Sequence, residues 1–178
     1  MERWHTMSKL ERNSAGRAVT INRIVDRLKN DEHLMRLLHY PHKDKDGNYQ
    51  DVLDEGFDDI VGSKDHGRIV RDHIIKTIQK DDIVSAKDCF ILIHLGKRRP
   101  VFGNHLLARQ EILIDVVVHN DYQDEDYRLD DICDRLDYLI VHERFGLGKV
   151  DISTPIPFEA PTGYYRFQMK YILWDTKK

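Results

Sequence analysis

Three side chains that can serve as metal ligands recur at four-residue steps in one apolar stretch of the sequence. Glu111, Asp115 and His119 would share one face of a strand, and such a set is what a small metal-dependent nuclease would use. Each step of four residues spans roughly 13 Å along a strand, too far for one ion to bridge without ligands from elsewhere. We therefore favour polar residues on the solvated face of an antiparallel sheet, with the nuclease as the alternative.

Other catalytic patterns fail on their spacing. The segment from Gly56 to Lys64 has five residues between its glycines and serine before lysine, whereas a phosphate-binding loop has four residues and the reverse order. The sequence has no Gly-x-Ser-x-Gly elbow, and Cys89 and Cys133 lack the C-x-x-C spacing of a metal knuckle or redox pair. We predict two buried free thiols and a protein that is not an enzyme, with no cofactor and no metal.

Charged residues gather in two clusters, one basic and one acidic. A solvated loop and a solvated helix face explain them equally well, and the basic cluster is open to contact with a protein or a nucleic acid. The net charge of -3 argues against a general basic surface for nucleic acid. Our hypothesis is that the basic cluster of one subunit reaches the acidic face of the next and helps to close a ring. The proposed contact residues are Lys97, Arg98, Arg99, Phe102, Asp130, Asp131, Asp134 and Asp137.

The second half of the chain carries the clearest structural pattern. Residues 89–95 and 111–119 are rich in β-branched side chains and are predicted strands, while residues 164–173 alternate in the period of a half-buried strand. Residues 96–107 are too many for a tight two-residue turn, so we expect an extended hairpin arm with residues 97–99 at its tip. Residues 127–141 predict an amphipathic helix after a polar turn at 120–126. A short strand at 150–152 follows, and prolines at 155, 157 and 161 exclude the next segment from a central sheet position.

The first half is predicted to be helical, with one long loop. Residues 1–16 show no apolar period and are interpreted as a mobile N-terminal arm. Apolar residues at helical spacing then predict a helix up to Asn30 and a second from Asp31, which ends at Pro41. Residues 42–67 predict a surface loop with short helical pieces, and residues 69–78 a short helix, with a strand as the weaker alternative.

These elements indicate one α+β domain spanning residues 1–178. It comprises a helical region (17–87) followed by a core (88–174) in which an antiparallel sheet of about four strands has a helix packed across one face. The length of 178 residues and the hydrophobic content of 40% suit a single core. Apolar runs stay far below the roughly 20 residues of a membrane span, and the N-terminus lacks the apolar segment of a secretory signal. We therefore expect a soluble protein made in the cytoplasm.

The layout resembles the tail terminator and neck (head-tail joining) proteins of tailed bacteriophages. The resemblance covers residues 21–40 and 89–174, and is closest at 112–120 (ILIDVVVHN), 127–137 (YRLDDICDRLD) and 163–171 (GYYRFQMKY). It implies a small α+β subunit, without catalytic residues, that forms a ring, typically a hexamer. Such a ring caps the tail tube, joins it to the head connector or stopper, and lets DNA pass through its lumen. An acidic lumen would repel the phosphate backbone, which fits the Asp-rich helix if that face points inward.

The sequence therefore predicts a virion structural protein located in the neck. Intersubunit contacts are expected from the arm and from the edges of the sheet. The expected partners are further copies of the chain, the tail tube, the sheath if the tail is contractile, the head connector or stopper, and DNA without sequence-specific binding. A head-completion or stopper protein of the same neck is the related alternative, and a monomeric cytoplasmic adaptor is a third reading.

Overall fold

The computed structural model describes residues 17–76, 87–145, 150–151 and 154–176, and the predicted N-terminal arm at 1–16 lies outside them. The helices are α2 (Arg17–Lys29), α3 (Glu32–His39), α4 (His66–His73), α6 (Asn120–Asp126) and α7 (Arg128–Ile140). The strands are β1 (Ile74–Ile75), β2 (Cys89–Val101), β3 (Asn104–His119), β4 (Val150–Asp151), β5 (Pro155–Pro157) and β6 (Tyr164–Thr176). None of the described helices is both long enough and apolar enough to cross a membrane.

The described strands form one sheet in the order β1-β2-β3-β6-β4, and β5 also pairs with β6. The long strands β2, β3 and β6 are antiparallel, but β1 pairs with β2 in parallel, so the sheet is mixed rather than strictly antiparallel. The parallel pair arises because β1 continues α4 without a break and α4 packs beside β2. The α+β class is confirmed. The predicted number of about four strands was low because β1 and β5 are too short to show a period.

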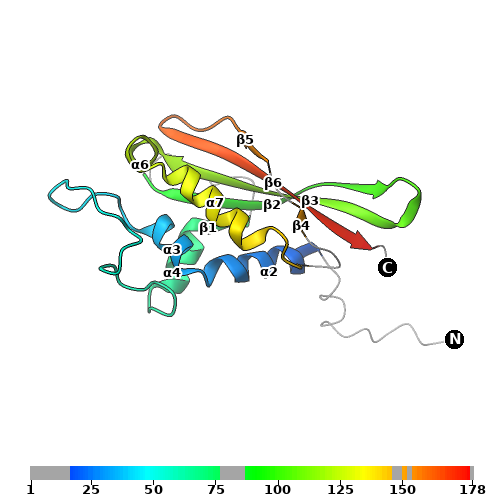
Figure 1. Cartoon of the computed structure of the whole chain (residues 1–178), viewed down its shortest axis with the longest axis horizontal. Helices are drawn as coiled ribbons and strands as arrows, with labels where there is room; N and C mark the ends of the chain where they lie inside the picture. Colours follow the sequence, from blue (N-terminus) through cyan, green and yellow to red (C-terminus); the bar gives the residue numbers. More distant parts are fainter. Residues whose placement is uncertain (1–16, 77–86, 146–149, 152–153, 177–178) are drawn as a thin grey trace.

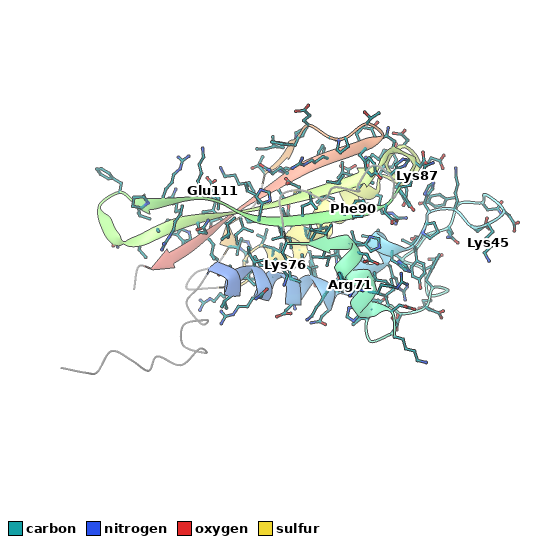
Figure 2. The ribbon with its side chains drawn as sticks, turned by 180° about the vertical axis from the view of Figure 1, so that it is seen from behind. Lys45, Arg71, Lys76, Lys87, Phe90 and Glu111 are labelled. Atoms are coloured by element: carbon teal, nitrogen blue, oxygen red, sulfur yellow. The ribbon has the colours of Figure 1, made fainter. Side chains whose placement is uncertain are left out.

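One face of the sheet is buried beneath helices α2, α3 and α7, with α7 in front of the sheet in Figure 1. Alternate residues of β3, from Ile112 to Val118, point into this core and meet the apolar side of α7, which includes Ile132 and Leu136. The predicted packing of an amphipathic helix across an apolar sheet face is therefore confirmed. In the described part of the chain, no helix lies across the opposite face, which is in front in Figure 2. We call this opposite face the open face because no described helix covers it, although Phe90, Leu92 and Val117 are buried there in a second, smaller apolar cluster.

The hairpin of β2 and β3 is longer and tighter than predicted. Its strands run on to Val101 and Asn104, which pair with each other, and the turn between them consists of Phe102 and Gly103 alone. Gly103 has a φ of +78°, which a residue without a side chain adopts without strain, so the tight turn is accessible. Residues 97–99 therefore lie within β2 and not at the tip. An arm is confirmed, although the prediction that its connection was too long for a two-residue turn was wrong.

Two helix boundaries also differ from the prediction. Residues 120–126 form helix α6 instead of a polar turn, and none of its residues is buried, so the segment gave no apolar period. Tyr127 separates α6 from α7 with a φ of +50°. The helix predicted at 69–78 ends at His73, where the chain enters β1, and residues 77–78 lie outside the described part.

The long segment between α3 and α4 is a loop, as predicted. The expected short helical pieces are wrong, because residues 41–65 form turns and bends with one isolated bridge between Lys43 and Tyr49. Two side chains of α3 hold the loop in place. Arg36 pairs with Asp59 at 2.7 Å, and Glu32 accepts hydrogen bonds from two backbone N–H groups, those of residues 60 and 61, at 2.8 Å each. These polar contacts act together with apolar packing, since Val52 and Ile60 of the loop are buried in the core.

Candidate subunit interface

A bulge in β2 shapes the base of the arm. The register shifts by one residue after Leu95, and Gly96 lies so close to β3 that an added Cβ would stand 2.8 Å from the Cβ of Glu111. The Glu111 carboxylate accepts a hydrogen bond from the backbone N–H of Lys97 at 3.1 Å, and the Gln110 amide donates to the Gly96 carbonyl at 3.1 Å. Two neighbouring side chains of β3 therefore fix the bulge, and with it the direction in which the arm leaves the core.

The bulge opens into a groove on the open face, which we call the arm groove. Its volume is about 380 Å³, and its lining comes from four strands: Gly96, Lys97, Arg99, Glu111, Leu113, Ile156, Gln168 and Lys170. Lys170 forms an ion pair with Glu111 at 3.0 Å, and this hydrogen bond lowers the pKa of Glu111. Since the one carboxylate is already paired, Lys97 and Arg99 leave the groove with a net positive charge.

A buried carboxylate lies next to the groove. Asp115 is fully buried and accepts hydrogen bonds from Arg166 at 2.7 Å and Gln168 at 2.8 Å. The Nδ1 atom of His94 stands 3.8 Å from the same carboxylate, and burial lowers the pKa of His94. The guanidinium of Arg166 also lies over the ring of Phe158, at 4.7 Å from its centroid. The prediction that Asp115 lies on a solvated face was therefore wrong, because neighbouring polar side chains enclose it.

The three residues of the nuclease alternative do not come together as ligands of one metal ion. Glu111 pairs with Lys170, Asp115 pairs with Arg166, and the Nδ1 atom of His119 accepts the backbone N–H of residue 121 at the start of α6. Within the described ranges, no group of three His, Cys, Asp or Glu side chains is placed to hold a metal ion. The three residues share a strand face, as predicted, but each has a different neighbour.

Basic and aromatic side chains continue along the arm beyond the groove. Arg99 lies opposite Arg109 in the ladder, and the guanidinium of Arg109 stands 4.6 Å from the ring centroid of Trp174 on β6. Arg98 lies opposite Gln110, on the other side of the strand from its two basic neighbours. The Phe102 side chain at the tip is 104% exposed. The arm therefore presents positive charge along its length and an apolar ring at its end.

The outer side of α7 carries the predicted acidic cluster, flanked by two aromatic rings. Asp130, Asp131 and Asp134 are exposed, while Tyr127 and Tyr138 are 69% and 71% exposed. These five residues recur at three- and four-residue steps, so they form one stripe along the helix. We call it the Tyr-Asp stripe.

Negative charge in this stripe is poorly compensated. Burial raises the pKa of Asp131, and the nearby carboxylates, Asp126 first, raise it further against the opposing effect of Arg128. Asp130 accepts a hydrogen bond from the amide of Gln123 at 2.9 Å, which is a neutral donor. A cation placed beside the stripe would therefore be attracted to it.

Asp137 has a different position from the other predicted acidic contacts. Its carboxylate is half-buried and accepts a hydrogen bond from the hydroxyl of Tyr171 on β6 at 2.9 Å. It therefore joins α7 to the sheet and stands apart from the stripe.

The two charged surfaces lie on opposite sides of the sheet. The stripe is on helix α7, which covers the front of the sheet in Figure 1. Glu111 follows the opposite direction, because its neighbour on β3, Ile112, points into the core beneath the helices and successive side chains of a strand alternate between the two faces. One copy of the chain cannot bring the surfaces together, so the predicted contact between them requires a second copy.

Sequence reasoning missed several residues of both surfaces. Lys170 and Trp174 belong to the alternating set of β6, so the period alone places them on one face, but the register that sets them beside Glu111 and Arg109 is a long-range property. The tyrosines of the stripe follow from helical spacing around Asp131 and Asp134 and were identifiable from the sequence.

Comparison with known proteins places the chain in a family. The model of the YomW family matches residues 31–173, which is most of the chain, so the chain belongs to the YomW family. This membership associates the protein with phages, the broader part of what the resemblance implied. No curated protein matches the sequence.

Proposed function

We propose that this YomW-family protein is a virion structural protein, a tail-terminator-like ring subunit in the neck of a tailed phage. In this role it caps the tail tube and joins it to the head connector or stopper. Its partners are further copies of itself, the tube, the sheath if the tail is contractile, and DNA that passes through the lumen without sequence-specific binding. It has no catalytic role. The family supports the phage context, and the ring and the neck position are our inference.

The observation that carries the proposal is the projecting arm. Residues 96–111 of β2 and β3 extend beyond the helix-covered part of the sheet (Figure 1). The arm ends at Phe102, which is fully exposed. An apolar side chain that stays exposed adds nothing to the stability of a monomer. An arm of this kind gains stability when a neighbouring molecule covers it.

The edges of the sheet suit association through side chains better than backbone pairing. Pro100 on β2 has no N–H to donate and follows three consecutive basic residues. On the opposite edge, β5 is the sequence Pro155-Ile156-Pro157. Prolines and like charges at an edge oppose uncontrolled strand addition. Of the two contact types that the sequence predicted, arm and edges, the structure therefore favours the arm.

The proposal is tested in a phage or prophage that encodes this chain. Stopping its translation should leave DNA-filled heads and completed tails unjoined, and purified wild-type virions should contain the chain at the head–tail junction in electron micrographs. Emptied heads would favour the stopper alternative, because a stopper retains packaged DNA. Absence of the chain from purified virions would refute a structural role.

A second test uses the purified chain. Incubated with isolated tail tubes, it should form a ring at one tube end, visible in negative stain. A matched variant with Phe102→Ser should bind the tube end less often, because the arm tip loses its apolar contact. Equal occupancy by both proteins would show that the arm tip does not contribute to assembly.

A further inference from the structure

We infer that the arm groove of one copy receives the Tyr-Asp stripe of a second copy, so that identical chains associate head to tail. The inference deepens the proposed function, since it names the contact through which the chain assembles with itself. It rests on one part of that function, the self-assembly of the chain. It does not depend on the location of the assembly in a phage neck.

Charge complementarity is the first argument. The groove combines Lys97, Arg99 and Lys170 with one carboxylate, Glu111, that is already paired. The stripe presents three exposed aspartates at adjacent positions of one helix face, and Asp130 accepts its hydrogen bond from the neutral amide of Gln123. Bringing the surfaces together would relieve repulsion on both, since each has an excess of one sign.

Spacing is the second argument. Asp131 and Asp134 are three residues apart on a helix, which separates their Cβ atoms by about 5–6 Å. Lys97 and Arg99 both line the groove and are two residues apart on a strand, or roughly 6.6 Å. Two parallel ion pairs can therefore form at once when the helix lies along the groove.

The apolar parts of both surfaces also match. Leu113 and Ile156 form an apolar side of the groove, and Ile156 is 47% exposed in the single chain. Tyr127 and Tyr138 stand at the two ends of the stripe and are 69% and 71% exposed, and the guanidinium of Arg135 lies 4.7 Å from the ring centroid of Tyr138. Tyrosine rings at interfaces combine an apolar body with a polar tip, so they can cover Ile156 while their hydroxyls stay solvated.

The placement of the surfaces determines the type of assembly. Because the groove and the stripe lie on opposite sides of the sheet, the contact is heterologous: each copy uses one surface toward one neighbour and the other toward the next. A heterologous contact closes into a ring or continues as a filament, and it cannot stop at a two-fold dimer. The surfaces therefore carry the geometry that a ring subunit needs.

Nucleic acid is a weaker occupant of the groove. A phosphate backbone would bring a continuous row of negative charges past Glu111 and against the apolar side chains of Leu113 and Ile156. The chain as a whole has a net charge of -3, which opposes approach of DNA. A helix face with a few spaced carboxylates and tyrosines meets these conditions better.

The test uses two variants that each lose one surface. The groove variant is Lys97→Glu with Arg99→Glu, which keeps the backbone N–H of Lys97 that holds the bulge. The stripe variant is Asp131→Asn with Asp134→Asn, which removes the two charges without creating a partner for the glutamates of the groove variant. The control variant is Lys45→Glu with Lys64→Glu, which repeats the charge change of the groove variant at exposed loop positions; Figure 2 shows Lys45 at the opposite end of the molecule from Glu111.

Native mass spectrometry and light scattering at low salt measure the assembled species. Wild type and the control variant should form oligomers, while the groove variant and the stripe variant should each associate at least about tenfold more weakly. Mixed together, the two defective variants should form a 1:1 heterodimer that grows no further, because only one groove and one stripe remain functional.

Three results would overturn the inference. One is a mixture of the defective variants in which no heterodimer forms, and another is a wild type that stays monomeric at the highest soluble concentration. The third is binding of a 20-base-pair DNA duplex by wild type but not by the groove variant, together with a mixture of the defective variants that forms no heterodimer. This result would identify the groove as a nucleic-acid site. If the purified variants form the heterodimer but the chain is absent from virions, only the proposed neck position is refuted. A chain located in the neck whose variants fail to complement would refute only this contact.

Discussion

Replacing Arg128 with alanine should remove the main polar connection between helices α3 and α7. Arg128 is fully buried at the start of α7. Its Nε donates to the Asp126 carboxylate, and its Nη1 donates to the carbonyls of Leu37 at 2.7 Å and Tyr40 at 3.0 Å. These carbonyls belong to the end of α3, where backbone oxygens lack partners within the helix. One guanidinium therefore fixes the relative position of two helices.

The cost follows from what the substitution leaves behind. The Asp126 side chain is only 10% exposed, and breaking a buried ion pair by removing one partner costs about 3–5 kcal/mol. The two carbonyls that lose their donor add to this, although such terms are not additive. We expect Arg128→Ala to lower the free energy of unfolding by about 4 kcal/mol. In a chain of this size that corresponds to a decrease in melting temperature of roughly 8–16 °C.

Urea unfolding followed by circular dichroism measures the change. The control is Arg68→Ala, because Arg68 is exposed and pairs only with Asp65 and Asp72, at 3.3 Å and 4.0 Å, among the interactions described, so its loss should cost less than about 0.5 kcal/mol. Arg128→Met combined with Asp126→Asn should be less harmful than Arg128→Met alone, because no unpaired charge remains. A loss below about 1 kcal/mol for Arg128→Ala would refute the reasoning.

Three further predictions concern the bulge, acid stability and the thiols. Gly96→Ala should lower the free energy of unfolding by about 1–3 kcal/mol in urea titrations, since the new methyl group has no room against β3; an unchanged midpoint would contradict this. Burial raises the pKa of Asp31, but hydrogen bonds from Arg135 and a backbone N–H outweigh it and lower the pKa overall. This group therefore stabilises the fold at neutral pH and loses that effect as the pH falls below about 4, so Asp31→Asn should flatten the acid side of a stability–pH curve, and an equally steep curve would argue against the pair. Burial raises the pKa of Cys89 and of Cys133 to about 12, so a thiol reagent at pH 8 should label them only in denaturant, and fast labelling of the folded chain would be the opposite outcome.

Local patterns predicted the elements that have one buried side. Helix α7 and strand β6 were identified because burial on one face imposes a period on the side chains, as with Leu136 and Tyr171. The same rule explains the failures. Beyond Leu95 the arm leaves the core and its pattern fades, so β2 was predicted too short, and α6 buries no residue and gave no period.

The candidate contact residues were predicted unevenly. Lys97, Arg99 and the exposed aspartates were chosen as charge clusters, and the structure gives each set a defined surface. Asp137 was grouped with them by sequence position, but its hydrogen bond to Tyr171 shows that helical spacing alone did not separate structural from exposed carboxylates.

The sequence by itself determined that a sheet with one apolar face would be covered by an amphipathic helix, and that basic and acidic clusters would lie on different elements. These properties follow from side-chain periods of two and 3.6 residues, which operate over a few neighbours. The tertiary structure alone decided that Asp115 is enclosed, that Lys170 and Glu111 close one side of a groove, and that the groove and the stripe lie on opposite sides of the sheet. Those facts depend on strand register and on which face the helices cover, and both are set by contacts between residues far apart in the chain.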